Sequence, residues 1–146
     1  MNVRRGGLAL LTVAAATALG GCGQSKEERA LEPVHRYMEA LADRDGERAC
    51  DQMTGEATRE YTSGLSEALQ QEFIACPEAA QAISGALGTD ERDAIRNGEF
   101  EIVLDEDEGV GRFRAIPGDG RVMTVAQQPD GDWLISGGWD FSAPDF

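Results

Sequence analysis

The stretch NGEFEIVL, residues 97–104, decides the fold, because the spacing of apolar residues changes within it. Before Asn97, apolar side chains recur every three or four residues, as they do on one face of a helix. After Gly98 they alternate with polar side chains, as in strands that bury one face. A helical half followed by a strand half predicts an α+β domain.

The apolar spacing before this stretch predicts a series of helices. The first covers residues 28–43, and the apolar residues on one of its faces are Leu31, Val34, Met38 and Leu41. A short second helix is expected over 47–53, with polar breaks at 54–55 and 62–64. Helical spacing then resumes through Leu65, Leu69, Phe73 and Cys76. Pro77 suits the first turn of a new helix that runs to Gly88, and 90–96 would add one further turn.

After the change of period, four strands are expected to form an antiparallel meander. Tight turns rich in Gly, Asp and Pro separate them at 105–109, 117–120 and 129–132. The sheet face turned toward the helices would carry Phe100, Ile102, Leu104, Phe113, Ala115, Val122, Trp133, Ile135 and Trp139. Opposite it the first helix would present Leu31, Val34, Tyr37, Met38 and Leu41.

Length and charge limit the function classes. The chain has 146 residues, which favours one domain, and a formal net charge of −14. Nucleic-acid binding is disfavoured, because it depends on Lys and Arg side chains that neutralise phosphates. A polybasic contact with anionic lipid is disfavoured for the same reason.

Residues 1–22 have the pattern of an export signal. Arg4 and Arg5 precede an apolar run over 8–19, which is too short to cross a bilayer as a permanent helix. The tetrapeptide Leu19-Gly20-Gly21-Cys22 resembles the lipobox of bacterial lipoproteins, whose cysteine is acylated and becomes the new N-terminus. The rival interpretation is an ordinary signal peptide followed by a coincidental cysteine.

This resemblance implies a processed and anchored protein. A lipoprotein signal peptide would occupy 1–21, a lipidated tether 22–28 and the domain 29–146. The mature protein would lie at the cell membrane, facing outside the cytoplasm, and the lipid anchor at Cys22 would be its contact with the membrane.

Two cysteines remain if Cys22 carries lipid. An exported protein is expected to pair them, so Cys50 and Cys76 predict a structural disulfide that stabilises the fold by about 3.5 kcal/mol on the chain-entropy model. A metal site is the rival interpretation. It fails because His35 is the only histidine and no CxxC or HxxxH spacing occurs. No metal and no cofactor is therefore expected.

Several segments resemble the nuclear-transport-factor-2-like (cystatin-like α+β) family, in its small exported lipoproteins. They are VHRYMEALADRD at 34–45, Ala49-Cys50, Cys76, and DGDWLI at 130–135. The resemblance implies N-terminal helices packed in the concave face of a curved, largely antiparallel sheet of four strands or slightly more. The candidate pocket inside this cone would be lined by Tyr37, Leu41, Phe73, Phe100, Phe113, Trp133 and Trp139.

Two functions fit such a domain. The favoured one is a non-catalytic module with no catalytic residues, which binds a small apolar ligand or an envelope protein. The alternative is an acid–base enzyme of the isomerase or dehydratase type, in which Tyr37 would act with Asp43 or Asp45. A buried carboxylate hydrogen-bonded to Tyr37 in an open pocket would favour the enzyme. His35 is expected to be a solvated helix residue.

The acidic run DEDEG at 105–109 superficially resembles a calcium-binding loop. Calcium loops of the EF-hand type join two helices, whereas this segment is expected to join two strands. A solvated hairpin turn is therefore favoured over weak cation binding.

Overall fold

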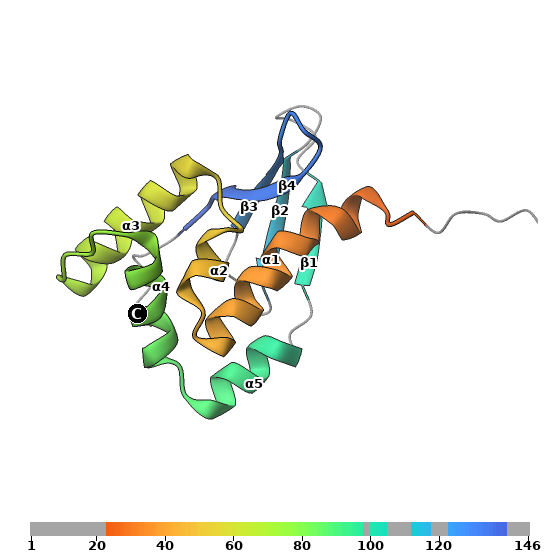
Figure 1. The fold of residues 1–146 in the computed structure, drawn as a ribbon. Coiled ribbons are helices and arrows are strands. Elements are labelled where there is room, and N and C mark those ends of the chain that lie inside the picture. Colours follow the sequence, from red (N-terminus) through yellow and green to blue (C-terminus); the bar gives the residue numbers. More distant parts are fainter. Residues whose placement is uncertain (1–22, 98–99, 105–111, 118–122, 140–146) are drawn as a thin grey trace, which may run out of the picture.

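The structure of this chain is a computed structural model, described here for residues 23–97, 100–104, 112–117 and 123–139. Over these ranges the helices are α1 (Lys26–Asp43), α2 (Gly46–Cys50), α3 (Gly55–Leu69), α4 (Cys76–Ala86) and α5 (Thr89–Asn97). They precede the strands β1 (Phe100–Leu104), β2 (Arg112–Pro117), β3 (Met123–Gln127) and β4 (Trp133–Gly137). The strands pair antiparallel in the order β1-β2-β3-β4. Helix α1 crosses the sheet, α3 and α4 lie together at one end of the molecule, and α5 lies along the lower edge of the view (Figure 1).

The predicted architecture, with helices held in the concave face of a curved four-stranded sheet, is wrong. The domain is mainly helical, and among the residues whose burial the structure describes, the core side chains of the sheet come from the β3–β4 hairpin: Met123, Val125, Trp133 and Ile135. The rest of that core comes from the helices and their connections, and much of it is alanine. Alanine side chains let helices approach closely, which favours the packing of helices on one another.

Helix α1 begins earlier than the spacing predicts. Ser25 is the N-cap: its Oγ accepts from the Glu28 N–H at 3.1 Å, and its own N–H donates to Glu28 Oε2 at 2.8 Å. This reciprocal pair satisfies two N–H groups that a helix end leaves open. The helix therefore takes up the last part of the predicted tether, 22–28, and leaves only Gly23 and Gln24 between Cys22 and the cap.

Helix α3 runs through the segment 62–64 that was predicted to break it. Tyr61 and Leu65 lie four residues apart and are both fully buried, so this face of the helix stays in the core. The helix ends at Leu69, where Gln70 adopts a left-handed conformation with φ of 51°. Phe73 and Cys76, predicted to continue the helix, belong to the next connection and to the start of α4.

A short contact joins α2 to α4. Gly46 is buried with its Cα against the Pro77 carbonyl, and a Cβ at this position would overlap that oxygen. Beside it the Cys50–Cys76 disulfide links the end of α2 to the start of α4, with the two Cα atoms 6.1 Å apart. The predicted pairing of these cysteines is confirmed.

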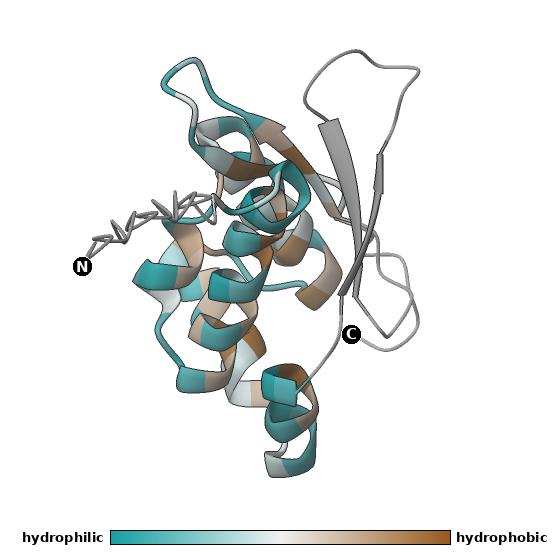
Figure 2. Ribbon diagram, turned by 90° about the vertical axis from the view of Figure 1, so that its right-hand side faces the viewer, coloured by the Kyte–Doolittle hydropathy of each residue, from teal (hydrophilic) through white to brown (hydrophobic). Residues whose placement is uncertain are grey.

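The β3–β4 hairpin is extended on its β4 side by the α2–α3 connection. The Ile135 N–H donates to the Gln52 carbonyl and the Thr54 N–H donates to the Ile135 carbonyl, both at 2.8 Å. These bonds cover part of an edge that would otherwise expose backbone groups. Hydrophobic residues of the helical layer and of this hairpin face inward, and hydrophilic residues dominate the outer faces of the helices (Figure 2).

Strand β3 presents a different face to the core than predicted. Met123 and Val125 are buried, whereas Thr124 is half-buried. The predicted inward residue, Val122, lies outside the described residues, but the burial of its neighbour at 123 reverses the expected alternation. Because side chains alternate along a strand, a shift of one residue exchanges the two faces.

Candidate functional site

A groove of about 1050 Å³ lies between α3 and the segment that connects α3 to α4. One wall is a row of α3 residues, the other is formed by residues 71–75, and the disulfide and Pro77 lie at its base. The lining residues are Cys50, Asp51, Thr58, Arg59, Thr62, Ser63, Ser66, Glu67, Gln70, Gln71, Glu72, Phe73, Ile74, Ala75, Cys76 and Pro77.

The α3 wall carries hydroxyl groups that act as hydrogen-bond acceptors. Thr58, Thr62 and Ser66 follow one another at four-residue spacing, so they lie in a row along the helix. Each hydroxyl donates to the backbone carbonyl four residues earlier, at 2.8–2.9 Å. The hydroxyl protons are therefore committed to the helix, and the oxygens offer lone pairs to the groove.

The opposite wall is tied to α3 and exposes one large apolar side chain. The Phe73 N–H donates to Ser66 Oγ at 3.1 Å, and the Phe73 ring is 8% exposed. The next residue, Ile74, is 88% exposed, while its N–H donates to Glu78 Oε2 at 3.1 Å. Burial of Phe73 thus fixes the segment and leaves the Ile74 side chain in solvent beside the groove.

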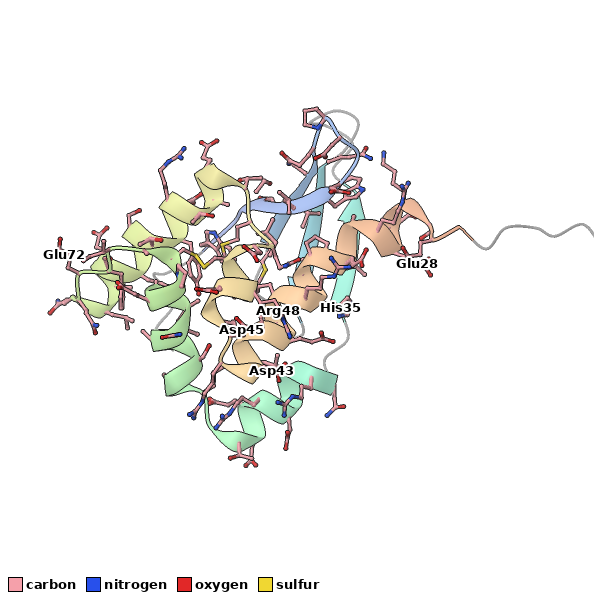
Figure 3. All side chains as sticks on the ribbon, viewed as in Figure 1. Glu28, His35, Asp43, Asp45, Arg48 and Glu72 are labelled. Atoms are coloured by element: carbon pink, nitrogen blue, oxygen red, sulfur yellow. A yellow bond between two sulfur atoms is a disulfide. The ribbon has the colours of Figure 1, made fainter. Side chains whose placement is uncertain are left out.

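The charge of the groove is mainly negative. Asp51, Glu67 and Glu72 contribute carboxylates, and Arg59 is the one basic residue among those that line it. All four residues are exposed. Glu72 lies at the far end of the molecule from Glu28, near the start of α1 (Figure 3).

In the described part of the predicted pocket, aromatic side chains pack on one another. Trp139 packs on both tyrosines, with ring centroids 4.9 Å from Tyr61 and 5.4 Å from Tyr37. Tyr37, Leu41 and Trp133 are buried in the same core cluster. Of the predicted lining residues whose side chains the structure describes, Phe73 borders the groove, and Trp133 borders a smaller recess of about 380 Å³ next to α1. The side chains of Phe100 and Phe113 lie outside the described part of the structure.

Tyr37 and Tyr61 form a buried hydrogen-bonded pair. The Tyr37 hydroxyl donates to the Tyr61 hydroxyl at 3.1 Å. Burial raises the pKa of Tyr61 to about 12, because an ionised phenolate would be poorly solvated there, and the Tyr37 hydrogen bond opposes part of this shift. The Tyr37 hydroxyl therefore meets a neutral phenol, where the enzyme hypothesis called for a carboxylate.

The acidic residues of the enzyme hypothesis lie elsewhere. Asp43 and Asp45 are exposed at the end of α1, whereas Tyr37 is buried, so the three do not share a cavity. Asp45 caps α2 by accepting from the Arg48 N–H at 3.0 Å. Hydrogen bonding to Arg96 and to Arg48 lowers the pKa of Asp43. His35 is exposed on α1, as Figure 3 illustrates.

In the described ranges, no group of three or more His, Cys, Asp and Glu side chains could hold a metal ion. The acidic run 105–109 falls outside those ranges. Among the helices described, none is long and apolar enough to cross a membrane.

The sequence does not reveal the groove, because the polar segment 62–64 in one of its walls indicates a break in the helix. Thr62, Ser63 and Gly64 are polar or small, and such triplets usually interrupt helices. The useful signal was the four-residue spacing of Thr58, Thr62 and Ser66, which places hydroxyls on one helix face while Tyr61 and Leu65 occupy another.

Comparison with known proteins gives no assignment: no protein-family model matches the chain, and no curated protein or solved structure matches it either.

Proposed function

We propose that this protein is a membrane-anchored lipoprotein that faces outside the cytoplasm and binds a partner without catalysing a reaction. The observation that carries the location is the Cys50–Cys76 disulfide. Structural disulfides persist in oxidising compartments and are rare in the cytoplasm. The sequence Leu19-Gly20-Gly21-Cys22 supplies the corresponding export and acylation signal.

The short spacing between Cys22 and α1 supports an anchored domain. Only Gly23 and Gln24 separate the cysteine from the Ser25 cap, so an acyl chain at Cys22 would hold the domain close to the bilayer. Two or more acyl chains are needed for stable anchoring, since each buried CH₂ contributes about 0.8 kcal/mol and one chain is marginal.

The chemistry of the groove supports binding over turnover. Cys50 and Cys76 are joined in a disulfide, so neither offers a thiolate nucleophile. The carboxylates of Asp51, Glu67 and Glu72 are exposed, whereas general acids and bases are usually tuned by burial or by close partners. Tyr61, whose pKa is raised by burial, belongs to the core and not to the groove.

The anchor is tested on the full chain expressed in a bacterial host. We expect the mature protein to begin at Cys22, to carry a diacylglyceryl mass on that residue and to sediment with membranes. Cys22→Ser should leave the precursor unprocessed or release the protein to the soluble fraction. Gln24→Ser, two residues further along, serves as the matched control and should remain anchored. An unmodified Cys22 in the mature wild-type protein would refute the proposal.

A further inference from the structure

The groove presents hydrogen-bond acceptors on its α3 wall, and its lining holds three carboxylates, those of Asp51, Glu67 and Glu72, against one basic side chain, that of Arg59. The hydroxyls of Thr58 and Thr62 donate hydrogen bonds to backbone carbonyls of α3, so their oxygens remain as acceptors. Beyond them, Glu67 and Glu72 add negative charge toward the end of the helix. A surface of this kind is complementary to a ligand that is rich in donors and positively charged, such as lysine or arginine side chains.

Ile74 adds an apolar contact at the same place. Among the described residues, the exposed large hydrophobic side chains are those of Ile74 and Leu69, at 88% and 38%, and both belong to the α3–α4 end of the molecule. An isolated exposed isoleucine is unremarkable, but this one lines the groove and is held there by the buried Phe73. It can receive an aliphatic side chain or the alkyl stem of a lysine.

The length of the groove suits an extended peptide. The α3 wall runs from Thr58 to Gln70, which corresponds to about 18 Å along a helix. An extended chain covers this distance with about six residues. Since Glu72 lies at the end of the molecule remote from Glu28 and the start of α1, an anchor at Cys22 would leave the groove accessible (Figure 3).

We infer that this groove binds an extended, cationic segment of a partner protein, with lysine or arginine on the acceptor row and an aliphatic side chain on Ile74. This inference rests on the proposed binding function and names the class of partner for it. The negative charge of the groove speeds association with a partner segment of positive charge. The apolar contact with Ile74 distinguishes a peptide from a small polyamine.

The test is a titration of the full mature protein, in a non-ionic detergent, followed by calorimetry. The probe is a peptide of about eight residues, slightly longer than the groove, with lysine at two positions, one central leucine and Gly or Ser elsewhere. We expect saturable binding that weakens as salt is raised. A peptide with glutamate in place of lysine should bind at least about fivefold more weakly, because exposed charge pairs each contribute about 0.2–1 kcal/mol.

Variants assign the binding to the groove. Glu67→Gln combined with Glu72→Gln should weaken the lysine peptide by about three- to tenfold. Asp90→Asn combined with Glu27→Gln removes the same charge from exposed positions outside the groove and should have no comparable effect. Ile74→Ser should weaken binding about fivefold, whereas Ile74→Leu should retain it. Because Ile74 is exposed, none of its variants should change the thermal midpoint.

Several outcomes would overturn the inference. Equal binding of the glutamate peptide would show that charge does not select the partner. Equal losses in the two charge-matched double variants would show a general attraction to an acidic protein. Full competition by spermidine with no effect of Ile74→Ser would identify a small polyamine. A dimer that Ile74→Ser dissociates would identify a second copy of the chain. The anchor at Cys22 is measured by mass and fractionation, so its failure is distinguishable from all of these.

Discussion

The hydroxyl of Tyr61 is buried at the junction of α1, α3 and Trp139, and its environment couples folding to pH. Its pKa is about 12 in the folded protein against 10.0 for an unperturbed tyrosine. The raised value means that the folded state favours the neutral phenol. The resulting stabilisation is complete below pH 10 and is lost as the pH rises through 12.

We therefore predict that unfolding becomes easier between about pH 10 and pH 12, by up to roughly 3 kcal/mol. Urea titrations at a series of pH values, followed by circular dichroism, measure this slope. Tyr61→Phe should lower stability by about 1 kcal/mol at neutral pH, because it removes the Tyr37 hydrogen bond, and should flatten the alkaline slope. An unchanged slope in that variant would show that another group is responsible.

Among the described glycines, Gly46 is the one where an added methyl group would meet the nearest backbone atom. Its Cβ would overlap the Pro77 carbonyl oxygen and lie 3.1 Å from Gln81 Cγ. Gly46→Ala should separate α2 from α4 and destabilise the protein by about 1–3 kcal/mol in chemical denaturation. Gly85→Ala in α4 is the control, since nothing lies within 4 Å of its added methyl group. It should stabilise by about 0.5–1 kcal/mol, because alanine favours helix.

Among the elements, α2 and α4 depend on their covalent link. The disulfide joins residues 26 apart, and closing a loop of that length stabilises by about 3.5 kcal/mol on the chain-entropy model. Cys50→Ala combined with Cys76→Ala should lose about this amount in urea denaturation. Wild-type protein treated with reductant should behave like the double variant, and equal stability of all three would contradict the prediction.

Helix α5 has no buried residue and is attached to α1 by an ion pair. Asp43 contacts Arg96 at 3.0 Å, across 53 residues of sequence, and Arg48 at 3.2 Å. Asp43→Asn should speed amide hydrogen exchange in α5 with little change in global stability. Asp93→Asn removes a contact to Arg96 within α5 itself, 3.6 Å long, and should have a smaller effect on exchange. Equal rates of amide hydrogen exchange in both variants would show that the Asp43–Arg96 ion pair does not attach α5 to α1.

At the element scale, the sequence predicts α1 well because its apolar residues recur without interruption. It does not predict the start at Lys26, because the Ser25–Glu28 pair depends on geometry that hydrophobic spacing does not report. The sequence predicts a break in the middle of α3 because residues 62–64 have low helix propensity. The helix continues there because tertiary burial of Tyr61 and Leu65 outweighs that low propensity. It also continues that helix to Phe73, which instead packs inward from a connection.

At the scale of the whole molecule, the sequence indicates helices before strands but not how the layers share the core. Alternation marks Trp133 and Trp139 as inward-facing, yet it cannot distinguish a hollow lined by aromatic rings from a core filled by them. Here Trp139 fills the space against Tyr37 and Tyr61. The groove arises instead where α3 and the 71–75 segment diverge, a feature that only the tertiary arrangement defines.

The anchored molecule should resist release by proteases. The first site for trypsin after Cys22 is Lys26, in the first turn of α1. Cleavage there requires local opening, so the rate follows the population of the open form. Ser25→Ala should speed release of the domain from membrane vesicles about fivefold, since an N-cap contributes about 1 kcal/mol. Ser25→Thr can still cap and should release slowly, and equal rates for the two variants would argue against a protective cap.

The aromatic cluster also gives the protein an optical signature. The chain has two tyrosines and two tryptophans, and both tyrosine rings lie against Trp139. At such short range, excitation energy absorbed by either phenol is transferred to the indole, so we expect the native protein to emit almost entirely as tryptophan. Separation of α1 from α3 would restore the ultraviolet emission of tyrosine. A simple ratio of two wavelengths therefore reports, without any added dye, whether the centre of the molecule is assembled.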